Sequence, residues 1–294
     1  MPELPDVVVY LERLRALLGD ARLVRVRVAN PFVLRTVEPP LAAVEGKKVQ
    51  GFERIGKRIV VCLEDELSLV VHLMIAGRLR WRKVDAAIPK SNGLAAFDFD
   101  AGTLLLTEAG RKRRASLHVV RGRDALAEFD RGGIDVSSAS LARFREALLQ
   151  ENHTLKRALT DQRVLSGIGN AYSDEILLRA KLSPFKQTQS LDNQEIAALF
   201  AATRDTVEEW TARLRAEVGD GFPEKVTAFR DGMAVHGRFG KPCPVCGAPV
   251  QRIVYATNES NYCARCQTGG KLLADRALSR LLKKNWPRKL EDME

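Results

Sequence analysis

Apolar side chains in residues 4–18 recur every three or four positions, which is the spacing of an amphipathic helix. The spacing of the apolar positions then changes. Between Arg22 and about Val120 the chain consists of short β-branched runs separated by turn residues, which predicts antiparallel strands in a sandwich or barrel. The runs are VRVRVA, RIVVCLE, LSLVVHLMI, GRLRW, AAFDFD, TLLLT and ASLHVV.

Helical patterns replace the strands after Gly133 and continue to about Val218. Ser140 is a suitable N-cap for a helix that runs to about Gln150. The segment SGIGN at 166–170 separates two helical stretches, LKRALTDQ and AYSDEILLRAKL, and Pro184 is expected to end the second. Two glycines between helices indicate a tight turn whose exposed N–H groups suit a phosphate, although an ordinary helix hairpin has the same pattern.

These patterns predict an α+β protein with an N-terminal helix and antiparallel β-sandwich, followed by a helical domain and a small C-terminal module. The 294 residues are enough for more than one domain. We expect the domains at 1–130, 131–235 and 236–270, followed by a basic tail at 271–294. The tail combines leucines with arginines and lysines, which predicts an amphipathic basic helix that either contacts phosphates or packs on the body.

The charge balance suggests a polyanionic partner. Lys and Arg number 47 against 37 Asp and Glu, and the positive residues gather at 111–123 and 276–289. A basic composition alone also fits many soluble enzymes. The opening MPELPDVVVY resembles no secretory signal, and no run approaches the ~18 apolar residues that span a bilayer. We therefore expect a cytoplasmic protein without a membrane partner.

Four of the five cysteines form two CxxC pairs separated by sixteen residues: Cys243, Cys246, Cys263 and Cys266. This spacing is typical of a tetrahedral zinc site, and four protein ligands leave no position for a catalytic water, so one structural Zn²⁺ is expected. Iron, a redox dithiol pair or disulfides are the alternatives. Residues 251–262 between the pairs are suited to a β-hairpin, so the C-terminal module at 236–270 is expected to be a zinc ribbon. Cys62 stands alone in an apolar run and is expected in the core.

The chain begins Met1-Pro2-Glu3. Removal of Met1 would expose the secondary amine of Pro2 beside the Glu3 carboxylate. An α-amino group has a pKa of about 8, against about 10.4 for lysine, so more of it is nucleophilic at neutral pH. Attack on a sugar C1′ would give an iminium that opens β-elimination, and Glu3 could move protons during ring opening. Read alone, a proline at position 2 reflects only protein processing.

In this order, these features resemble the formamidopyrimidine-DNA glycosylase and endonuclease VIII family. The likeness extends from residue 1 to about 268. It is carried by PELPD, RIGKRIVVCLE, VHLMIAGRLR, DQRVLSGIGNAYSDEILLRAKLSP, HGRFGKPCPVCG and YCARCQ. The resemblance implies a helix-two-turn-helix in the helical domain and a monomer that binds duplex DNA containing damaged bases or abasic sites.

The resemblance also implies roles for individual residues. Pro2 corresponds to the Schiff-base nucleophile and Glu3 to the acid/base carboxylate. Lys57 corresponds to a lysine that contacts phosphate and assists the lyase steps, unless it is a solvated loop lysine. His72 and Asn170 correspond to residues that contact the DNA backbone, although a histidine satisfied in a strand and a helix cap are the simpler interpretations.

The implied activity is excision of oxidised bases, formamidopyrimidine or 8-oxoguanine-type purines, followed by cleavage of the abasic site. The alternatives are a diverged member that acts on oxidised pyrimidines or other lesions, and a non-catalytic damaged-DNA-binding protein.

Three departures from the family pattern concern substrate choice. The family stretch HLGMSG reads HLMIAG here, so Ile75 replaces the methionine that fills the space of the flipped base, and Met74 replaces a glycine. The loop at 110–114 lacks the family's aromatic wedge, for which Arg111 is a candidate substitute. Asn258 occupies the position of a phosphate-binding arginine, which removes a charge and a bidentate donor.

Overall fold

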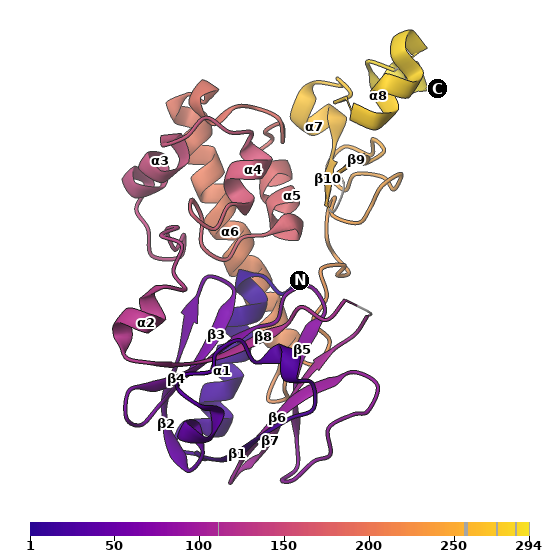
Figure 1. The fold of residues 1–294 in the computed structure, drawn as a ribbon. Helices are drawn as coiled ribbons and strands as arrows, with labels where there is room; N and C mark the ends of the chain where they lie inside the picture. The colour runs from indigo at the N-terminus through magenta and orange to yellow at the C-terminus, as the bar shows by residue number, and fades with distance from the viewer. Residues whose placement is uncertain (111, 256–257, 275, 286, 294) are drawn as a thin grey trace. The chain divides into compact units, whose positions relative to one another are not determined.

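The computed structural model describes residues 1–110, 112–255, 258–274, 276–285 and 287–293 (Figure 1). It divides into two units. The first contains Met1–Arg131 and Trp210–Thr227, and the second contains Gly132–Glu209 and Ala228–Glu294. Each unit is described below by itself.

The first unit contains an eight-stranded antiparallel sheet and the helix α1 (Leu4–Leu18), which has the bounds that its apolar spacing predicts. The strand order is β5-β7-β6-β1-β2-β3-β4-β8. The strands are β1 (Arg22–Val28), β2 (Lys47–Ile55), β3 (Arg58–Leu63), β4 (Leu67–His72), β5 (Gly77–Arg82), β6 (Gly93–Phe99), β7 (Gly102–Glu108) and β8 (Ser116–Arg121).

The strand β2 was absent from the sequence prediction because it is mostly polar. Only Val49 and Phe52 are buried along it. Its pairing with β1 is limited to Arg22↔Lys48 and Leu23↔Lys47, whereas it pairs with β3 along most of its length. The two halves of the sheet are therefore joined through a short contact, and side chains from both halves share one core with α1. This arrangement confirms the expected sandwich.

The other face of β3, β4 and β8 is covered by α2 (Arg123–Ala127). A smaller apolar cluster there contains Val60, Val70, Val120 and Leu126. These strands are buried on both faces, which explains their nearly continuous apolar sequences. Cys62 is half-buried at the edge of this cluster, in partial agreement with the core position expected for it.

The segment Trp210–Thr227 returns to the first unit, although it lies far along the chain. Phe222 packs on Tyr10 of α1 with ring centroids 5.6 Å apart, and Val226 belongs to the main core. Arg215 forms an ion pair with Glu12 at 2.6 Å. The helix α1 is thus held by the C-terminal part of α6 (Asn193–Val218) and by the residues that follow it.

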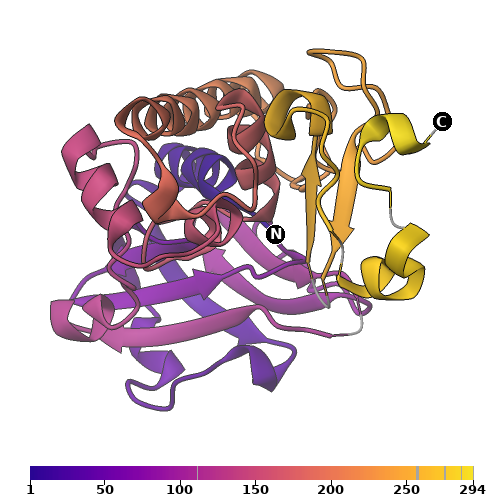
Figure 2. The same ribbon diagram turned by 90° about the horizontal axis from the view of Figure 1, so that it is seen from above.

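The second unit is helical and ends in the ribbon and tail (Figure 2). Its first helices are α3 (Leu141–Leu149), α4 (Leu155–Thr160), α5 (Asn170–Arg179) and α6 (Asn193–Val218), and the last of these continues into the first unit. Ser140 caps α3 as expected, because its side chain accepts from Arg143 N at 3.3 Å. The prediction that Pro184 ends α5 is wrong: the helix ends at Arg179, and Lys181 turns the chain with a positive φ of 55°.

The predicted hairpin is present as β9 (Gln251–Val254) and β10 (Glu259–Tyr262), followed by α7 (Ala264–Thr268). The tail does not form one long helix. The helix α8 (Arg276–Leu282) is short, and the chain then returns so that Leu272 N donates to Arg288 O at 2.8 Å. Leu272 packs in a cluster with Ile253 and Tyr262 of the hairpin, so this part of the tail packs on the ribbon.

None of the helices in the described ranges combines the length and the apolar composition needed to cross a membrane.

Candidate functional site

The chain start is fixed by a reciprocal capping box at the first turn of α1. The Glu3 side chain accepts from the backbone of Asp6, and the Asp6 side chain accepts from Glu3 N at 2.8 Å. Both carboxylates are buried, with 2% and 3% of their surface exposed. A helix N-terminus attracts anionic groups, so this turn holds two carboxylates beside the terminus.

The terminal amine lies in a strongly polar environment. Burial lowers the pKa of the Met1 amine below its usual 8.0. Arg78 and Lys57 lower this pKa further, while Glu3 and Asp6 raise it. Pro2, the next residue, is itself buried. The structure thus brings the three predicted catalytic residues, Pro2, Glu3 and Lys57, into one neighbourhood.

Lys57 lies in the tight turn between β2 and β3, where Ile55 pairs with Arg58 and Gly56 adopts a positive φ of 60°. The side chain is not solvated: only 6% of Lys57 is exposed. This burial removes the interpretation of Lys57 as a solvated loop lysine. An ammonium held near the terminus by a two-residue turn is in a position to act on an anion bound there.

His72 ends β4 and pairs in register with Arg58 on one side and Ser116 on the other. Burial, followed by the nearby cations Arg58 and Lys57, lowers the pKa of His72 to about 4. The imidazole is therefore neutral at pH 7 and can donate one hydrogen bond and accept another. Its position beside Lys57 places it with the residues around the chain start.

The turn between β4 and β5 carries one of the departures from the family pattern. Gly77 N donates to Leu73 O at 2.8 Å, and a Cβ on Gly77 would lie 2.2 Å from that oxygen, so only glycine fits there. Met74 adopts a positive φ of 51°, which is unfavourable for a residue with a side chain. Ile75 is 59% exposed. The turn therefore presents an apolar side chain to solvent.

Arg111 lies outside the described residues. The base of its loop is ordered by Glu108, a buried carboxylate that accepts from Arg114 N at 2.8 Å and Ala115 N at 2.9 Å. Arg113 donates to Ser91 O at 2.8 Å. Sequence reasoning missed Glu108, although an acidic residue at the end of an apolar strand was a usable signal.

Asn170 is the first residue of α5, and Gly169 is the N-cap, so the Asn170 side chain does not serve as the cap. The preceding turn is braced by Gln162, whose side chain accepts from Gly167 N at 2.9 Å and donates to Ile168 O at 2.7 Å. Gly167 has a positive φ of 90°. Sequence reasoning missed Gln162, for which the motif gave no spacing signal. The turn leaves Asn170 partly exposed at a helix N-terminus, where an anion is favoured.

The four predicted metal ligands come together. The Sγ atoms of Cys243, Cys246, Cys263 and Cys266 all lie within 4.8 Å of one another. Sulfurs on a tetrahedral zinc ion are about 3.8 Å apart, as follows from a Zn–S distance of about 2.3 Å. Each pair lies on its own turn, the first closed by Gly247 and the second by the start of α7. These residues fit zinc, which would hold the two turns together.

Comparisons with known proteins agree with this organisation in chain order. The formamidopyrimidine-DNA glycosylase N-terminal domain matches residues 1–115, and the H2TH domain of the same enzymes matches residues 134–215. The zinc finger found in FPG and IleRS matches residues 240–269. The last match and the sulfur geometry together show one structural zinc site.

Curated relatives and solved structures span most of the chain. A formamidopyrimidine-DNA glycosylase of Thermus thermophilus is 33% identical over 285 residues, which cover 92% of this chain and 100% of the relative. An uncharacterized formamidopyrimidine-DNA glycosylase-like protein of Mycobacterium tuberculosis is 44% identical over 51% of this chain and 91% of its own length. The crystal structure of the Thermus thermophilus MutM (Fpg) protein, 32% identical, superposes with a TM-score of 0.75 over 90% of this chain and 98% of that one.

A Lactococcus lactis Fpg mutant in complex with DNA containing Fapy-dG has the same fold, with a TM-score of 0.80 over 91% of this chain and 100% of that one at 24% identity. The fold, the helix-two-turn-helix and the zinc ribbon define a DNA repair glycosylase. The chain belongs to the formamidopyrimidine-DNA glycosylase family. The resemblance stated from the sequence is thereby confirmed.

Proposed function

We propose that this protein excises oxidised bases from duplex DNA and then cleaves the abasic site, with the amine of Pro2 as its nucleophile. The observation that carries the proposal is the surroundings of the terminus: the buried Glu3 carboxylate and the buried Lys57 ammonium both act on the terminal amine. Removal of Met1 would move the reactive amine by one residue within this polar cluster.

The chemistry follows from these groups. The Pro2 lone pair forms a bond to C1′ of an everted nucleotide, and the electrons of the glycosidic bond leave with the base, which takes a proton. Glu3 protonates the ring oxygen as the sugar opens to the iminium. Loss of the C2′ proton then expels the 3′-phosphate by β-elimination, and loss of the C4′ proton expels the 5′-phosphate by a second elimination. Water finally hydrolyses the iminium, which releases the sugar fragment and the free Pro2 amine. Lys57 stabilises the phosphate charge during these steps.

His72 and Asn170 are proposed to contact the DNA backbone, and Arg111 is proposed to occupy the space beside the orphaned base. The Lactococcus lactis relatives were crystallised with Fapy-dG and abasic-site DNA, which supports damaged duplex DNA as the partner. We further propose that the protein acts as a monomer and that the domains have the limits expected from the sequence, with residues 210–227 of the helical domain packed in the first unit. Limited proteolysis and light scattering test these two points.

Borohydride trapping on an abasic-site duplex tests the nucleophile. The zinc-loaded protein without Met1 should form a covalent adduct, and peptide mapping should place the adduct on Pro2. Pro2→Gly should lose most of the adduct, whereas Pro5→Ala, which changes a proline that carries no reactive amine, should retain it. Absence of an adduct with the unmodified protein would favour the non-catalytic DNA-binding protein.

The lesion itself is proposed to be an oxidised purine, on the basis of the PELP opening. The turn with Met74 and Ile75 supports a second candidate, a diverged preference for oxidised pyrimidines or an altered choice of opposite base. Rates of excision on duplexes with formamidopyrimidine, 8-oxoguanine and oxidised pyrimidines, each opposite all four bases, distinguish the two.

A further inference from the structure

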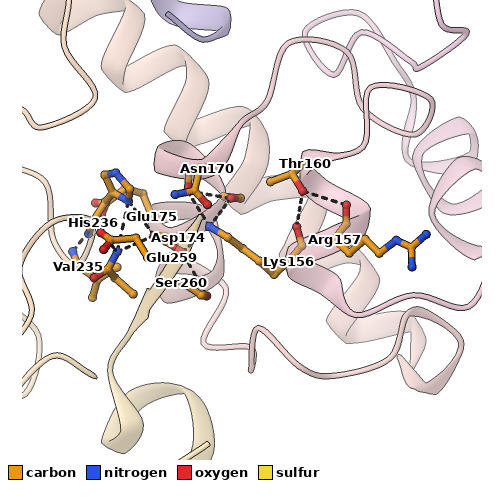
Figure 3. A network of polar contacts seen from close by, with 12 residues as sticks. Lys156, Arg157, Thr160, Asn170, Asp174, Glu175, Val235, His236, Glu259 and Ser260 are labelled. Atoms are coloured by element: carbon orange, nitrogen blue, oxygen red, sulfur yellow. Dashed lines mark hydrogen bonds and ion pairs between the residues drawn. The ribbon is translucent and has the colours of Figure 1, made fainter. Parts of the chain in front are cut away.

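A buried polar network in the second unit joins the helix-two-turn-helix to the zinc ribbon (Figure 3). Asp174 of α5 is its centre, and its side chain is fully buried. One carboxylate oxygen accepts from Lys156 Nζ of α4 at 2.5 Å. The other pairs with His236 Nδ1 at 2.8 Å. The Asp174 carboxylate therefore binds groups from both the helical part and the ribbon part of the unit.

On the helical side, the Lys156 ammonium has three acceptors. Besides Asp174, it donates to Asn170 O at 2.7 Å and to Ser173 Oγ at 2.8 Å. An ammonium has three protons to donate, so all three are used. The ammonium thus fixes the backbone of Asn170, the residue proposed to contact a phosphate.

On the ribbon side, each cysteine pair is attached to α5 through nearby residues. Asn261, two positions before Cys263, donates to the same Asp174 oxygen as His236 at 3.2 Å. His236 precedes the first pair, and Glu175 accepts from the backbone N–H groups of Ala234, Val235 and His236 at 2.7 to 2.9 Å. Figure 3 shows these segments converging on Asp174 and Glu175.

A network of this kind transmits changes because its members are buried. A buried charge that loses one partner keeps its desolvation penalty, so the remaining partners must rearrange around it. If the ribbon loosens, Asn261 and His236 move, Asp174 is released and Lys156 loses its main counter-charge. The carbonyl of Asn170 then loses its donor.

We propose that Lys156, Asp174 and His236 are positioning residues that couple zinc binding in the ribbon to the phosphate-binding turn at Asn170. The part that concerns DNA rests on the proposed function. Coupling between two sites is reciprocal, so bound DNA must retain zinc by the same factor by which zinc strengthens DNA binding.

The test measures zinc affinity by equilibrium competition with a colorimetric chelator, with and without an abasic-site duplex. DNA should protect bound zinc by raising its affinity about tenfold in the unmodified protein, within the usual range of coupling between sites. In Lys156→Met this protection should fall to about twofold or less. The Lys156 partners described above all belong to α5, so none of these hydrogen bonds joins Lys156 directly to the ribbon. Lys186→Met is the matched control, since Lys186 pairs with Glu195 in the same unit outside the network. It should retain the protection.

His236→Phe is a second variant that keeps a ring of similar size and the backbone N–H to Glu175 but loses the contact with Asp174. It should also lose protection, and its defect should appear in the Kd for DNA more than in the single-turnover rate at saturating DNA. If both variants bind zinc more weakly but DNA still raises their zinc affinity about tenfold, the network is only structural and the proposal is wrong. Failure of borohydride trapping in the unmodified protein would instead reject the proposed function.

Discussion

The two buried polar clusters of this protein differ in how the chain assembles them. Around the terminus, Glu3 and Asp6 cap each other within one helical turn, and Lys57 is placed by a two-residue turn. In the second unit, Asp174 meets His236 and Asn261, which lie 62 and 87 positions further along the chain. The first cluster is built mainly by local contacts and the second by the tertiary fold.

The two clusters are therefore expected to have different roles, reaction at the terminus and structural support around Asp174. Local contacts position most of the groups that are proposed to react, and they leave the apolar core to other residues. Distant contacts hold separate segments together, so their loss should first affect stability. The predictions below test this division, beginning with the largest expected effect.

Glu3→Gln should slow single-turnover base excision by roughly 100 to 10,000-fold, the usual contribution of a general acid/base group. The amide oxygen can still accept from Asp6 N, so urea denaturation should show a change of less than about 1 kcal/mol in the free energy of unfolding. Asp6→Asn is the matched control and should retain most of the excision rate. Equal loss in both variants would mean that the turn, rather than the Glu3 carboxylate, is what matters.

Asp174→Ala should reduce the free energy of unfolding by about 3 to 5 kcal/mol, because it leaves the Lys156 ammonium buried without its counter-charge. The same measurement on Glu12→Gln, which breaks the exposed pair with Arg215, should show a change of less than about 1 kcal/mol. A similar, small effect for both variants would mean that the buried pair contributes no more to stability than the exposed pair, which would contradict the structural role given to the second cluster.

His72 should make stability depend on pH. Its pKa is lowered to about 4 in the folded protein, so between pH 6.5 and 4 the unfolded chain binds a proton that the folded one does not. This contribution is fully present above pH 6.5 and is lost as the pH falls, by about 2 kcal/mol between pH 8 and pH 5. His72→Gln should flatten the curve of unfolding free energy against pH by that amount. Parallel curves would show that His72 is not buried as described.

The smallest expected effect concerns Met74. Glycine relieves the left-handed conformation, worth about 1 to 2 kcal/mol, but loses about 0.5 to 1 kcal/mol of backbone entropy. Met74→Gly should therefore raise the free energy of unfolding by about 0.5 kcal/mol. Ala76→Gly in the same turn has no positive φ to relieve and should lower it. Thermal unfolding of both variants beside the unmodified protein makes the measurement.

How much the sequence could predict follows the same division between local and distant contacts. The periodicity of residues 4–18, the Ser140 cap and the CxxC spacing are local signals, and the structure has each of them. The polar strand β2 was not predicted because only two of its residues are buried, so its sequence lacks the apolar run that marks the other strands. The end of α5 was misplaced because Lys181, which carries no turn signal, ends the helix region.

Neither periodicity nor spacing in the sequence indicated that the residues of the second cluster meet. Lys156 and Asp174 have the appearance of ordinary charged residues on helices, and only the fold shows that they are buried together. Distance along the chain explains this, since no window of sequence contains both halves of the network. The roles assigned to Pro2, Glu3, Lys57, His72 and Asn170 stay predictions.

The turn between β4 and β5 also bears on how the protein could evolve. Ile75 is outside the core, on a scaffold that Gly77 and its bond to Leu73 already define. Replacement of this side chain should therefore leave the rest of the molecule almost untouched. A library of all amino acids at position 75 would test the proposed role of this side chain in lesion choice with little effect on folding, and such exposed positions are where natural variants of an enzyme can diverge without loss of stability.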